Sequence, residues 1–265
     1  MDPARKTPEW VAYKLRYKPP QTPGRDCRWG QDASVDASFQ AHDSDYKNSH
    51  QSTRPRCDDQ VESCGFERGH LAPAKTFSYS CDAECSTFTF INAAPQIKSV
   101  NAGAWKWGEM YVRKYLLDNP DSTVHVITGV LHERKTVNEL MSKETKKSLI
   151  KKHTGVHVPT NYYTAVYDAT MKRGFGMIAG NNNKVKGSKV LPALSLAELE
   201  DRVGIQLFKR AGFLSAGISE AARTAPWMGG GVDAATKVDP YTHPVNEQCR
   251  PFCKRYERRG RGGGM

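Results

Sequence analysis

The sequence predicts an α+β fold with a mixed or antiparallel central sheet and flanking helices. Short runs rich in β-branched and aromatic residues, typical of strands, are interrupted by two helical segments. No regular strand–helix–strand repeat links them, which argues against a parallel α/β sheet. The chain has 265 residues, which is enough for one large domain with a well-buried core.

The domain organisation follows from composition along the chain. Residues 1–25 are rich in proline and basic side chains, which predicts a flexible arm, although apolar and polar residues alternate at 10–15 as in a first strand. We expect the main domain to span residues 10–215, with 47–63 as a surface insertion. Residues 216–265, where apolar periodicity fades before a basic, glycine-rich tail, form a C-terminal extension that we expect to be mobile.

The remaining elements are expected in the following order. Strands are expected at 87–91, 123–129, 157–167 and 175–178. A helix should run from about residue 101 to about 117, because aromatic residues supply an apolar surface there and no proline interrupts it. A second helix should begin at Ser195, which forms a capping box with Glu198, and continue to about Phe208.

The charge of the chain favours a polyanionic partner. A net charge of +11 makes nucleic acid the first expectation and an anionic membrane surface the second, with solubility alone as the alternative. No stretch approaches the roughly 20 consecutive apolar residues that a membrane helix needs. We therefore expect a soluble protein without a membrane partner. The first residues also contain no apolar stretch typical of a signal peptide.

Seven cysteines bear on the redox compartment. Six of them form close pairs in the sequence, which are Cys57 with Cys64, Cys81 with Cys85, and Cys249 with Cys253, and Cys27 is left over. This clustering predicts disulfides and an oxidising compartment, with a bridge from Cys57 to Cys64 pinning the insertion. Two alternatives stay open, a four-thiolate zinc site built from the last two pairs and plain reduced cysteines.

Three short strings carry the functional prediction. They are Gly-Phe-Glu-Arg-Gly-His at residues 65–70, Asn-Ala-Ala-Pro-Gln at 92–96, and Asn-Ala-Gly-Ala-Trp at 101–105, with Glu109 four residues further on. They place an imidazole, a guanidinium, amides and a carboxylate within a window of about forty residues. These are the groups that a one-metal phosphodiesterase needs.

The strings resemble the DNA/RNA non-specific endonucleases of the ββα-metal fold, and within them the endonuclease G branch, over roughly residues 10–212. The family motif reads Asp-Arg-Gly-His, then Asn-x-x-Pro-Gln, then Asn-x-x-x-Trp with a glutamate four residues later. Glu67 stands where the family has Asp, and the other motif positions match. Three strings in order at the family spacing are a specific signal.

The resemblance implies a catalytic and metal-binding role for three side chains. His70 is the candidate general base, because an imidazole titrates near working pH. Asn101 is the candidate direct Mg²⁺ ligand, because Mg²⁺ prefers oxygen donors, although an asparagine at a helix start is also a common N-cap. Glu109 would hold the ion through bound water, and its alternative role is an ion pair with Arg113.

The resemblance also implies which residues contact the phosphate and which support the site. Arg68 and Arg113 are the candidate phosphate clamps, because a guanidinium can donate two parallel hydrogen bonds. Arg28 is a further candidate nucleic-acid contact, and Arg25 is placed equally well. Asn92 matches a family asparagine that supports the site through hydrogen bonds around the helix that carries the metal ligand.

Three further positions carry expectations, namely Glu67, Trp105 and Trp107. Glu67 would help to organise metal-bound water, but its extra methylene moves the carboxylate by about a bond length, so we expect reduced activity or an altered metal preference. Trp105 and Trp107 invite a base-stacking role, but on a core helix they are expected to be packing residues.

The sequence therefore predicts a Mg²⁺-dependent, sequence-non-specific endonuclease acting on DNA and RNA, with Mn²⁺ as a substitute ion and with activity that falls with salt. The resemblance also implies 5′-phosphate products and a homodimer. The alternatives are a nucleic-acid-binding protein that lost turnover through Glu67 and a zinc-stabilised structural module. Localisation stays unassigned, because the cysteine pairs favour secretion whereas the resemblance favours mitochondria.

Overall fold

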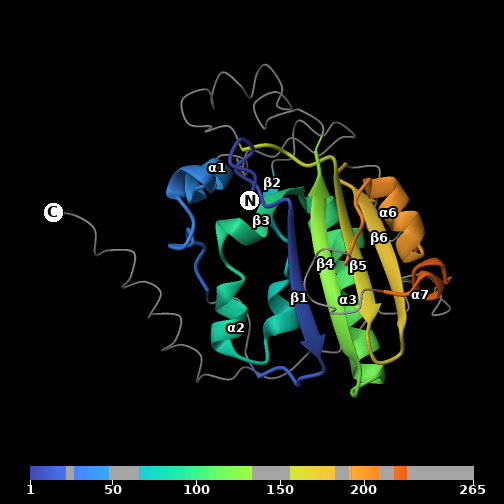
Figure 1. Cartoon of the computed structure of the whole chain (residues 1–265). Coiled ribbons are helices and arrows are strands. Elements are labelled where there is room, and N and C mark those ends of the chain that lie inside the picture. The colour runs from blue at the N-terminus through green and yellow to red at the C-terminus, as the bar shows by residue number, and fades with distance from the viewer. Residues whose placement is uncertain are drawn as a thin grey trace.

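A computed structural model describes residues 1–21, 27–47, 66–132, 156–182, 191, 193–208 and 218–225 (Figure 1). Its larger elements, in chain order, are β1 (Trp10–Arg16), α1 (Asp43–Lys47), β2 (Phe66–His70), α2 (Cys81–Ser86), β3 (Ala93–Ile97), α3 (Trp105–Asp118), β4 (Thr123–Leu131), β5 (Asn161–Asp168), β6 (Arg173–Gly180), α6 (Leu196–Val203) and α7 (Glu220–Thr224). Short 3₁₀ turns lie at η1 (Ala37–Phe39), η3 (Ala74–Phe77) and η4 (Phe90–Asn92), and a π-turn, η5 (Val100–Ala104), precedes α3. This mixture confirms the α+β prediction.

The larger sheet has four antiparallel strands in the order β1-β4-β5-β6. Its central strands are buried along almost their whole length, which indicates that both faces of the sheet are covered. On one face Val126 and Val166 join a hydrophobic cluster with Trp105 of α3. On the other face Ile127 and other residues join a cluster with α6. The domain therefore has three layers, with α3 and α6 on opposite sides of the sheet (Figure 1).

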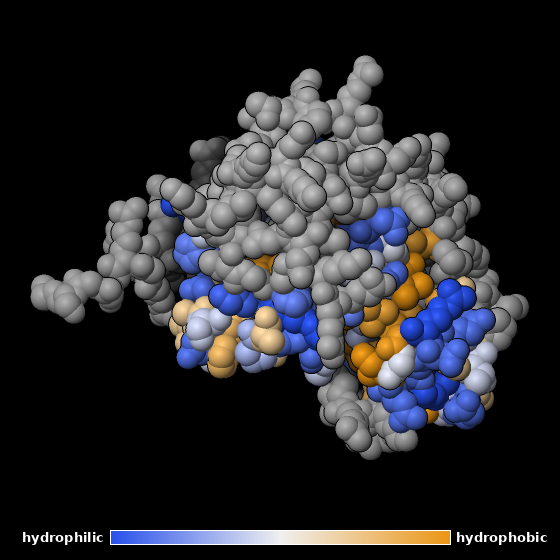
Figure 2. Space-filling model, turned by 90° about the horizontal axis from the view of Figure 1, so that it is seen from above, coloured by the Kyte–Doolittle hydropathy of each residue, from blue (hydrophilic) through white to orange (hydrophobic). Residues whose placement is uncertain are grey.

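The sequence of helix α6 explains where the helix begins and which side packs against the sheet. Ser195 caps it through a complete capping box with Glu198, as predicted. Its buried residues Leu196, Leu199 and Val203 recur at helical spacing and face the sheet. In the view from above, hydrophobic residues form a strip bordered by hydrophilic ones, the pattern that amphipathic elements produce when their apolar sides meet (Figure 2).

The smaller sheet consists of β2 and β3 alone, paired antiparallel from Phe66 opposite Ile97 to His70 opposite Ala93. The π-turn η5 and helix α3 follow β3 directly in the chain. Two antiparallel strands followed by a helix are the ββα arrangement that the resemblance implies, and the pairing brings the first two motif strings side by side.

Several element predictions differ from the structure. The strand expected at 87–91 is wrong, because a 3₁₀ turn occupies Phe90–Asn92 and the strand is β3, which contains Pro95. A proline is tolerated there because a two-stranded sheet leaves one side of each strand unpaired. Helix α6 ends before Gly204, whose φ of +68° is a left-handed cap, rather than at about residue 208.

The N-terminal arm and the C-terminal extension also differ from expectation. Residues 1–9 are not a free arm, because Asp2 pairs with Thr7 and the His157 backbone N–H donates to the Arg5 carbonyl at 3.0 Å. Helix α7 packs on α6 through an ion pair between Arg223 and Glu200, so the folded domain reaches beyond residue 215. Of the insertion expected at 47–63, residue 47 ends helix α1, and residues 48–63 lie outside the described residues, as do residues 226–265. No helix in the described ranges is long and apolar enough to cross a membrane.

The packing of α6 predicts that Leu199→Ala lowers the free energy of unfolding by about 2–4 kcal/mol, because the removed side chain leaves a cavity. Leu199 is fully buried, and a Cβ added at Gly176 would lie 2.7 Å from it. Ile205→Ala is the matched control, because Ile205 is 44% exposed and should cost less than about 0.5 kcal/mol. Urea unfolding measures both variants, and equal effects would contradict the packing assignment.

Candidate active site

The pairing of β2 with β3 positions the first motif string. Glu67 lies opposite Gln96, Arg68 opposite Pro95, and Gly69 opposite Ala94. A Cβ at Gly69 would lie 2.5 Å from the Gln96 amide oxygen and 2.6 Å from the Gln96 Cβ, which is closer than real side chains approach. Gly69 is therefore required by the close approach of Gln96, which is itself fully buried.

Alternation along β2 separates the motif side chains into two groups, because successive side chains of a strand point to opposite faces. Arg68 and His70 share one face, and both contact Trp29. Glu67 points to the other face, where it meets Asn101. The structure thus places the candidate base His70 on one face with Arg68, the candidate phosphate contact. On the other face it places Glu67 next to Asn101, the candidate metal ligand.

His70 lies half-buried between two aromatic rings. Its ring centroid is 4.6 Å from that of Trp29, at an interplanar angle of 50°. It is 4.9 Å from Phe88 in an edge-to-face arrangement. The Nε2 atom is covered from solvent. Packing on two sides restricts the rotation of the imidazole, which is what a general base requires for a defined direction of attack.

Arg68 contacts one carboxylate and two aromatic rings. Its guanidinium forms an ion pair with Asp43 of α1 and lies 5.8 Å from the Trp29 ring centroid and 5.7 Å from that of Tyr46. The side chain remains 24% exposed. Among the described residues, its buried Nε finds no hydrogen-bond partner. A guanidinium that is held by a carboxylate and remains partly exposed is compatible with the predicted phosphate contact.

Asn92 acts on the chain that follows His70. Its amide nitrogen donates to the carbonyls of Ala72 at 3.0 Å and Thr87 at 2.8 Å, and its amide oxygen accepts from the Ala72 backbone N–H at 2.8 Å. These bonds fix the end of β2, not the helix that carries the metal ligand, so the predicted location of its support is corrected. These hydrogen bonds of the Asn92 side chain go to main-chain groups, which fits a supporting role next to the candidate base His70.

Asn101 lies in the π-turn η5, one residue after its start, and not in the first turn of α3. Gly103 leaves the helical conformation within this turn, and such π-turns occur frequently at functional sites. The N-cap alternative is wrong, because Ser99 and Ala104 occupy the cap positions and Asn101 Nδ2 donates to Glu67 Oε2 at 2.7 Å. This bond leaves the amide oxygen of Asn101, the better Mg²⁺ ligand, directed away from Glu67.

Glu109 and Arg113 lie one turn apart on α3. Glu109 Oε2 is 4.0 Å from the Arg113 guanidinium, and the same guanidinium nitrogen lies 3.4 Å from Thr76 Oγ1. Arg113 is only 1% exposed, whereas the Glu109 side chain is 21% exposed. This burial argues against Arg113 as a phosphate clamp and supports the ion-pair alternative. The Glu109 carboxylate therefore lies between the buried Arg113 guanidinium and the solvent.

Behind Glu109 lies a small cavity of about 20 Å³, room for one water molecule, lined by Tyr13, Trp105, Thr128 and Thr164 among others. Burial raises the pKa of Tyr13 well above its ordinary value, while a hydrogen bond to Thr128 opposes the shift. Tyr13 therefore stays a neutral hydroxyl next to Glu109. The sequence singles out Trp105 but not Tyr13, Thr128 or Thr164, because nothing in the spacing of separate strands shows that their side chains meet.

Arg28 is exposed and follows Cys27 directly in the chain. Its predicted contact with nucleic acid stays a prediction, and Arg25 lies outside the described residues.

Trp105 is 3% exposed, and its ring centroid lies 5.4 Å from that of Tyr162. Trp107 is partly buried against the same core. The prediction that these two tryptophans are packing residues is confirmed.

The cysteines pair differently from the expectation based on sequence proximity. Cys27, expected to be left over, forms a disulfide with Cys85, 58 residues away. Cys81 is disulfide-bonded as well. The zinc alternative that required Cys81 and Cys85 as thiolates is therefore wrong. The predicted Cys57–Cys64 bridge lies outside the described residues.

The residues present fit a hard cation. The described part of the chain contains no group of three or more His, Cys, Asp or Glu side chains arranged to hold a metal. A site with one amide oxygen from Asn101, and with Glu67 and Glu109 acting through water, does not need such a group. All three offer oxygen atoms, which is the donor set that Mg²⁺ prefers, and Mg²⁺ usually keeps several waters.

Comparisons with known proteins find a matching family model and similar nucleases. Residues 1–211 match the family model described as DNA/RNA non-specific endonuclease. The chain is 32% identical to human mitochondrial endonuclease G over 164 residues, which is 61% of this chain and 49% of that protein. It is 29% identical to the mitochondrial nuclease EXOG of Xenopus laevis over 215 residues, 78% of this chain and 55% of that one. It thus spans about half the length of these curated relatives.

Two further matches bear on compartment and fold. A salivary endonuclease of Lutzomyia longipalpis is 31% identical over 121 residues, 46% of this chain and 28% of that protein. A chain in the crystal structure of the EndoG/EndoGI complex superposes with a TM-score of 0.57 at 21% identity, covering 78% of this chain and 80% of that chain. At this identity the likeness shows the fold alone.

The bonds of Asn92 predict that Asn92→Ala lowers the free energy of unfolding by roughly 2–3 kcal/mol, because it leaves buried backbone groups without partners. Asn119→Ala is the matched control. Asn119 is half-buried and its amide donates to one carbonyl, that of Tyr115, so its loss should cost less than about 1 kcal/mol. Thermal and urea unfolding measure both, and an Asn92 variant as stable as the control would contradict the supporting role.

Proposed function

Because the chain belongs to the DNA/RNA non-specific endonuclease family, we propose that it is a metal-dependent endonuclease that hydrolyses phosphodiester bonds of DNA and RNA. One observation carries the proposal: the motif side chains lie on a ββα unit in which Glu67 of the first strand is hydrogen-bonded to Asn101 of the turn that opens the helix. Family membership makes nucleic acid the substrate class. The net charge of +11 supports a polyanionic substrate.

His70 is the proposed general base. Its imidazole takes a proton from a water molecule as the water oxygen attacks phosphorus, and the bond to the 3′ oxygen breaks, which leaves a 5′-phosphate. The contacts with Trp29 and Phe88 support this role, because they hold the ring in one orientation. Arg68 binds a phosphate oxygen through the donors that Asp43 does not occupy.

Asn101 is the proposed direct ligand of Mg²⁺, for which Mn²⁺ can substitute. When bound, the ion stabilises negative charge on the phosphate and the leaving oxygen. Glu67 accepts a hydrogen bond from the Asn101 amide, and Glu109 would accept hydrogen bonds from water bound to the ion. Arg113 lies beneath Glu109 and keeps its carboxylate in place.

The alternative is a nucleic-acid-binding protein weakened by the replacement of Asp with Glu67. The hydrogen bond between Glu67 and Asn101 argues against this alternative, because the longer side chain of Glu67 reaches the candidate metal ligand.

If the protein contacts mainly the phosphate backbone, cleavage should show little base preference and should slow as the salt concentration rises. The Cys27–Cys85 disulfide favours an oxidising compartment over a mitochondrial one, and a homodimer remains an expectation from the resemblance.

Replacing the base tests the proposal directly. We expect the wild type to cut supercoiled plasmid and total RNA with Mg²⁺, EDTA to stop both reactions, and His70→Ala to lower kcat by roughly 10²–10⁴-fold. His157→Ala is the matched control, because His157 is half-buried against His132 and belongs to none of the motif strings. A wild type that binds DNA in a shift assay without cutting either substrate under any divalent ion would establish the weakened alternative.

The Glu67–Asn101 bond predicts a graded effect on metal affinity. Glu67→Gln removes the charged acceptor and should raise the Mg²⁺ concentration for half-maximal cleavage by about 10- to 100-fold. Glu67→Asp keeps the charge but shortens the side chain, so we expect less than about a tenfold change. Titration of cleavage rate against Mg²⁺ measures both variants. A large gain of activity in Glu67→Asp would instead show that the natural glutamate impairs the enzyme.

A further inference from the structure

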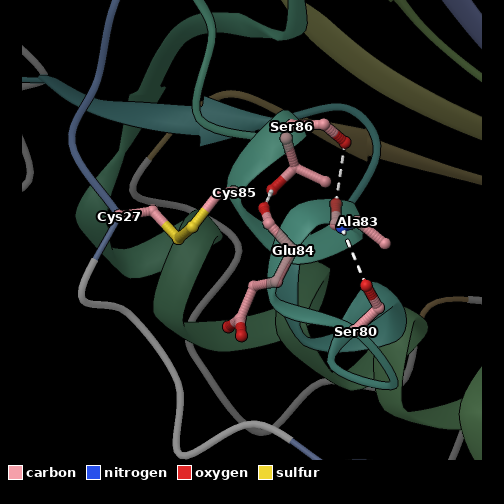
Figure 3. Close-up of a disulfide and its surroundings, with 7 residues drawn as sticks. Cys27, Ser80, Ala83, Glu84, Cys85 and Ser86 are labelled. Atoms are coloured by element: carbon pink, nitrogen blue, oxygen red, sulfur yellow. Dashed lines mark hydrogen bonds between the residues drawn. A yellow bond between two sulfur atoms is a disulfide. The ribbon is translucent and has the colours of Figure 1, made fainter. Parts of the chain in front are cut away.

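Trp29 lies in a short segment that is fixed at both ends. Two residues before it, Cys27 is joined by a disulfide to Cys85 at the end of α2 (Figure 3). One residue after it, the Gly30 N–H donates to the Phe88 carbonyl at 3.1 Å, and the Gly30 carbonyl accepts from the Phe90 N–H at 3.0 Å. The main chain therefore allows the Trp29 indole little displacement relative to residues 85–90.

The indole of Trp29 contacts both motif side chains on its face of β2. Its ring centroid lies 4.6 Å from that of His70 and 5.8 Å from the central carbon of the Arg68 guanidinium. Its other neighbours are Phe88 at 5.3 Å and Phe90 at 5.8 Å. The indole thus lies between the reacting groups and an aromatic cluster that is anchored in the protein.

We propose, on the basis of the proposed endonuclease function, that Trp29 is a positioning residue of the nuclease centre that also stabilises the protonated state of His70. When the imidazole accepts the proton, a water O–H bond breaks, an N–H bond forms and the ring becomes a cation. The hydroxide oxygen bonds to phosphorus, and the 3′ oxygen leaves with the electron pair of its bond. The positive charge therefore develops on a ring whose centroid lies 4.6 Å from that of the indole.

The physical reason lies in the charge distribution of the indole. Tryptophan attracts a cation within about 6 Å of its ring more strongly than the other aromatic residues do. His70 carries the charge in the transition state and not in the ground state, so this attraction lowers the barrier rather than tightening substrate binding. Arg68 is charged throughout, so its contact with the same ring changes little during the reaction. The effect of Trp29 is therefore expected in kcat more than in KM.

A merely structural role would give a different pattern of substitutions. Trp29→Leu keeps much of the apolar contact but removes the aromatic face, whereas Trp29→Phe keeps an aromatic face. If Trp29 only fills space, both variants lose similar activity. If it stabilises the imidazolium, phenylalanine rescues part of the loss and leucine does not.

The test compares purified full-length wild type with Trp29→Leu, Trp29→Phe and the matched control Trp10→Leu, whose indole is 50% exposed. Plasmid cleavage with Mg²⁺ gives kcat and KM, and circular dichroism verifies folding. We expect Trp29→Leu to lower kcat by roughly 5- to 30-fold with KM within about threefold, and Trp29→Phe to lie between it and the wild type. The control should match the wild type.

Two additional measurements test the contact between Trp29 and His70, and the second of them does not depend on activity. The Cys27→Ser/Cys85→Ser double variant releases one anchor of the Trp29 segment and should lower kcat in the same direction. The NMR signals of the His70 ring protons should shift in Trp29→Leu and stay in place in Trp10→Leu, because an adjacent indole shields them.

The outcomes separate this proposal from the endonuclease function itself. Equal kcat values for Trp29→Leu and Trp29→Phe, or a Trp29→Leu variant within twofold of the wild type, would overturn the role of Trp29 while leaving the function intact. A wild type that does not cleave, or a His70→Ala variant that cleaves normally, would overturn both. If kcat falls in the expected order and wild-type cleavage depends on His70, the results support both the role of Trp29 and the endonuclease function.

Discussion

The antiparallel pairing of β2 with β3 is the constraint on which the candidate site depends. Backbone pairing from Phe66 opposite Ile97 to His70 opposite Ala93 sets the register of two of the three motif strings. The close approach of Gln96 to Gly69 permits no side chain at that glycine. A shift of one residue in this register would move Arg68 and His70 to the opposite face and separate Glu67 from Asn101.

A two-stranded ribbon is too small to be rigid by itself, and the surrounding residues supply the missing support. Asn92 ties the chain after His70 to the turn before β3. On one face of the ribbon, Trp29 and its neighbours enclose Arg68 and His70, and the Cys27–Cys85 disulfide holds that segment to α2. On the other side, the packing of α3 against the four-stranded sheet fixes the helix that carries Glu109.

Buried polar groups are concentrated where the site meets the core. Arg113 is almost fully buried, and it is neutralised by Glu109 and hydrogen-bonded to Thr76. Tyr13, Thr128 and Thr164 line a small cavity on the same side of α3. Burying such groups opposes folding unless they are paired. These polar groups lie around Glu109, and the ion pair and the hydrogen bond of Arg113 offset the cost of burying its charge.

The sequence by itself determined the α+β class, the capping box of α6, and the three strings whose order and spacing identify the family. These features are local, or they depend on residues that are close in the chain. Only the tertiary structure decided that Cys27 pairs with Cys85, that Arg113 is buried, that Asn92 supports the strand of His70, and that Trp29 touches both Arg68 and His70. The physical reason is that these contacts join segments separated by tens of residues. Their partners are chosen by strand register and by packing, and neither leaves a signal in the local pattern of one sequence.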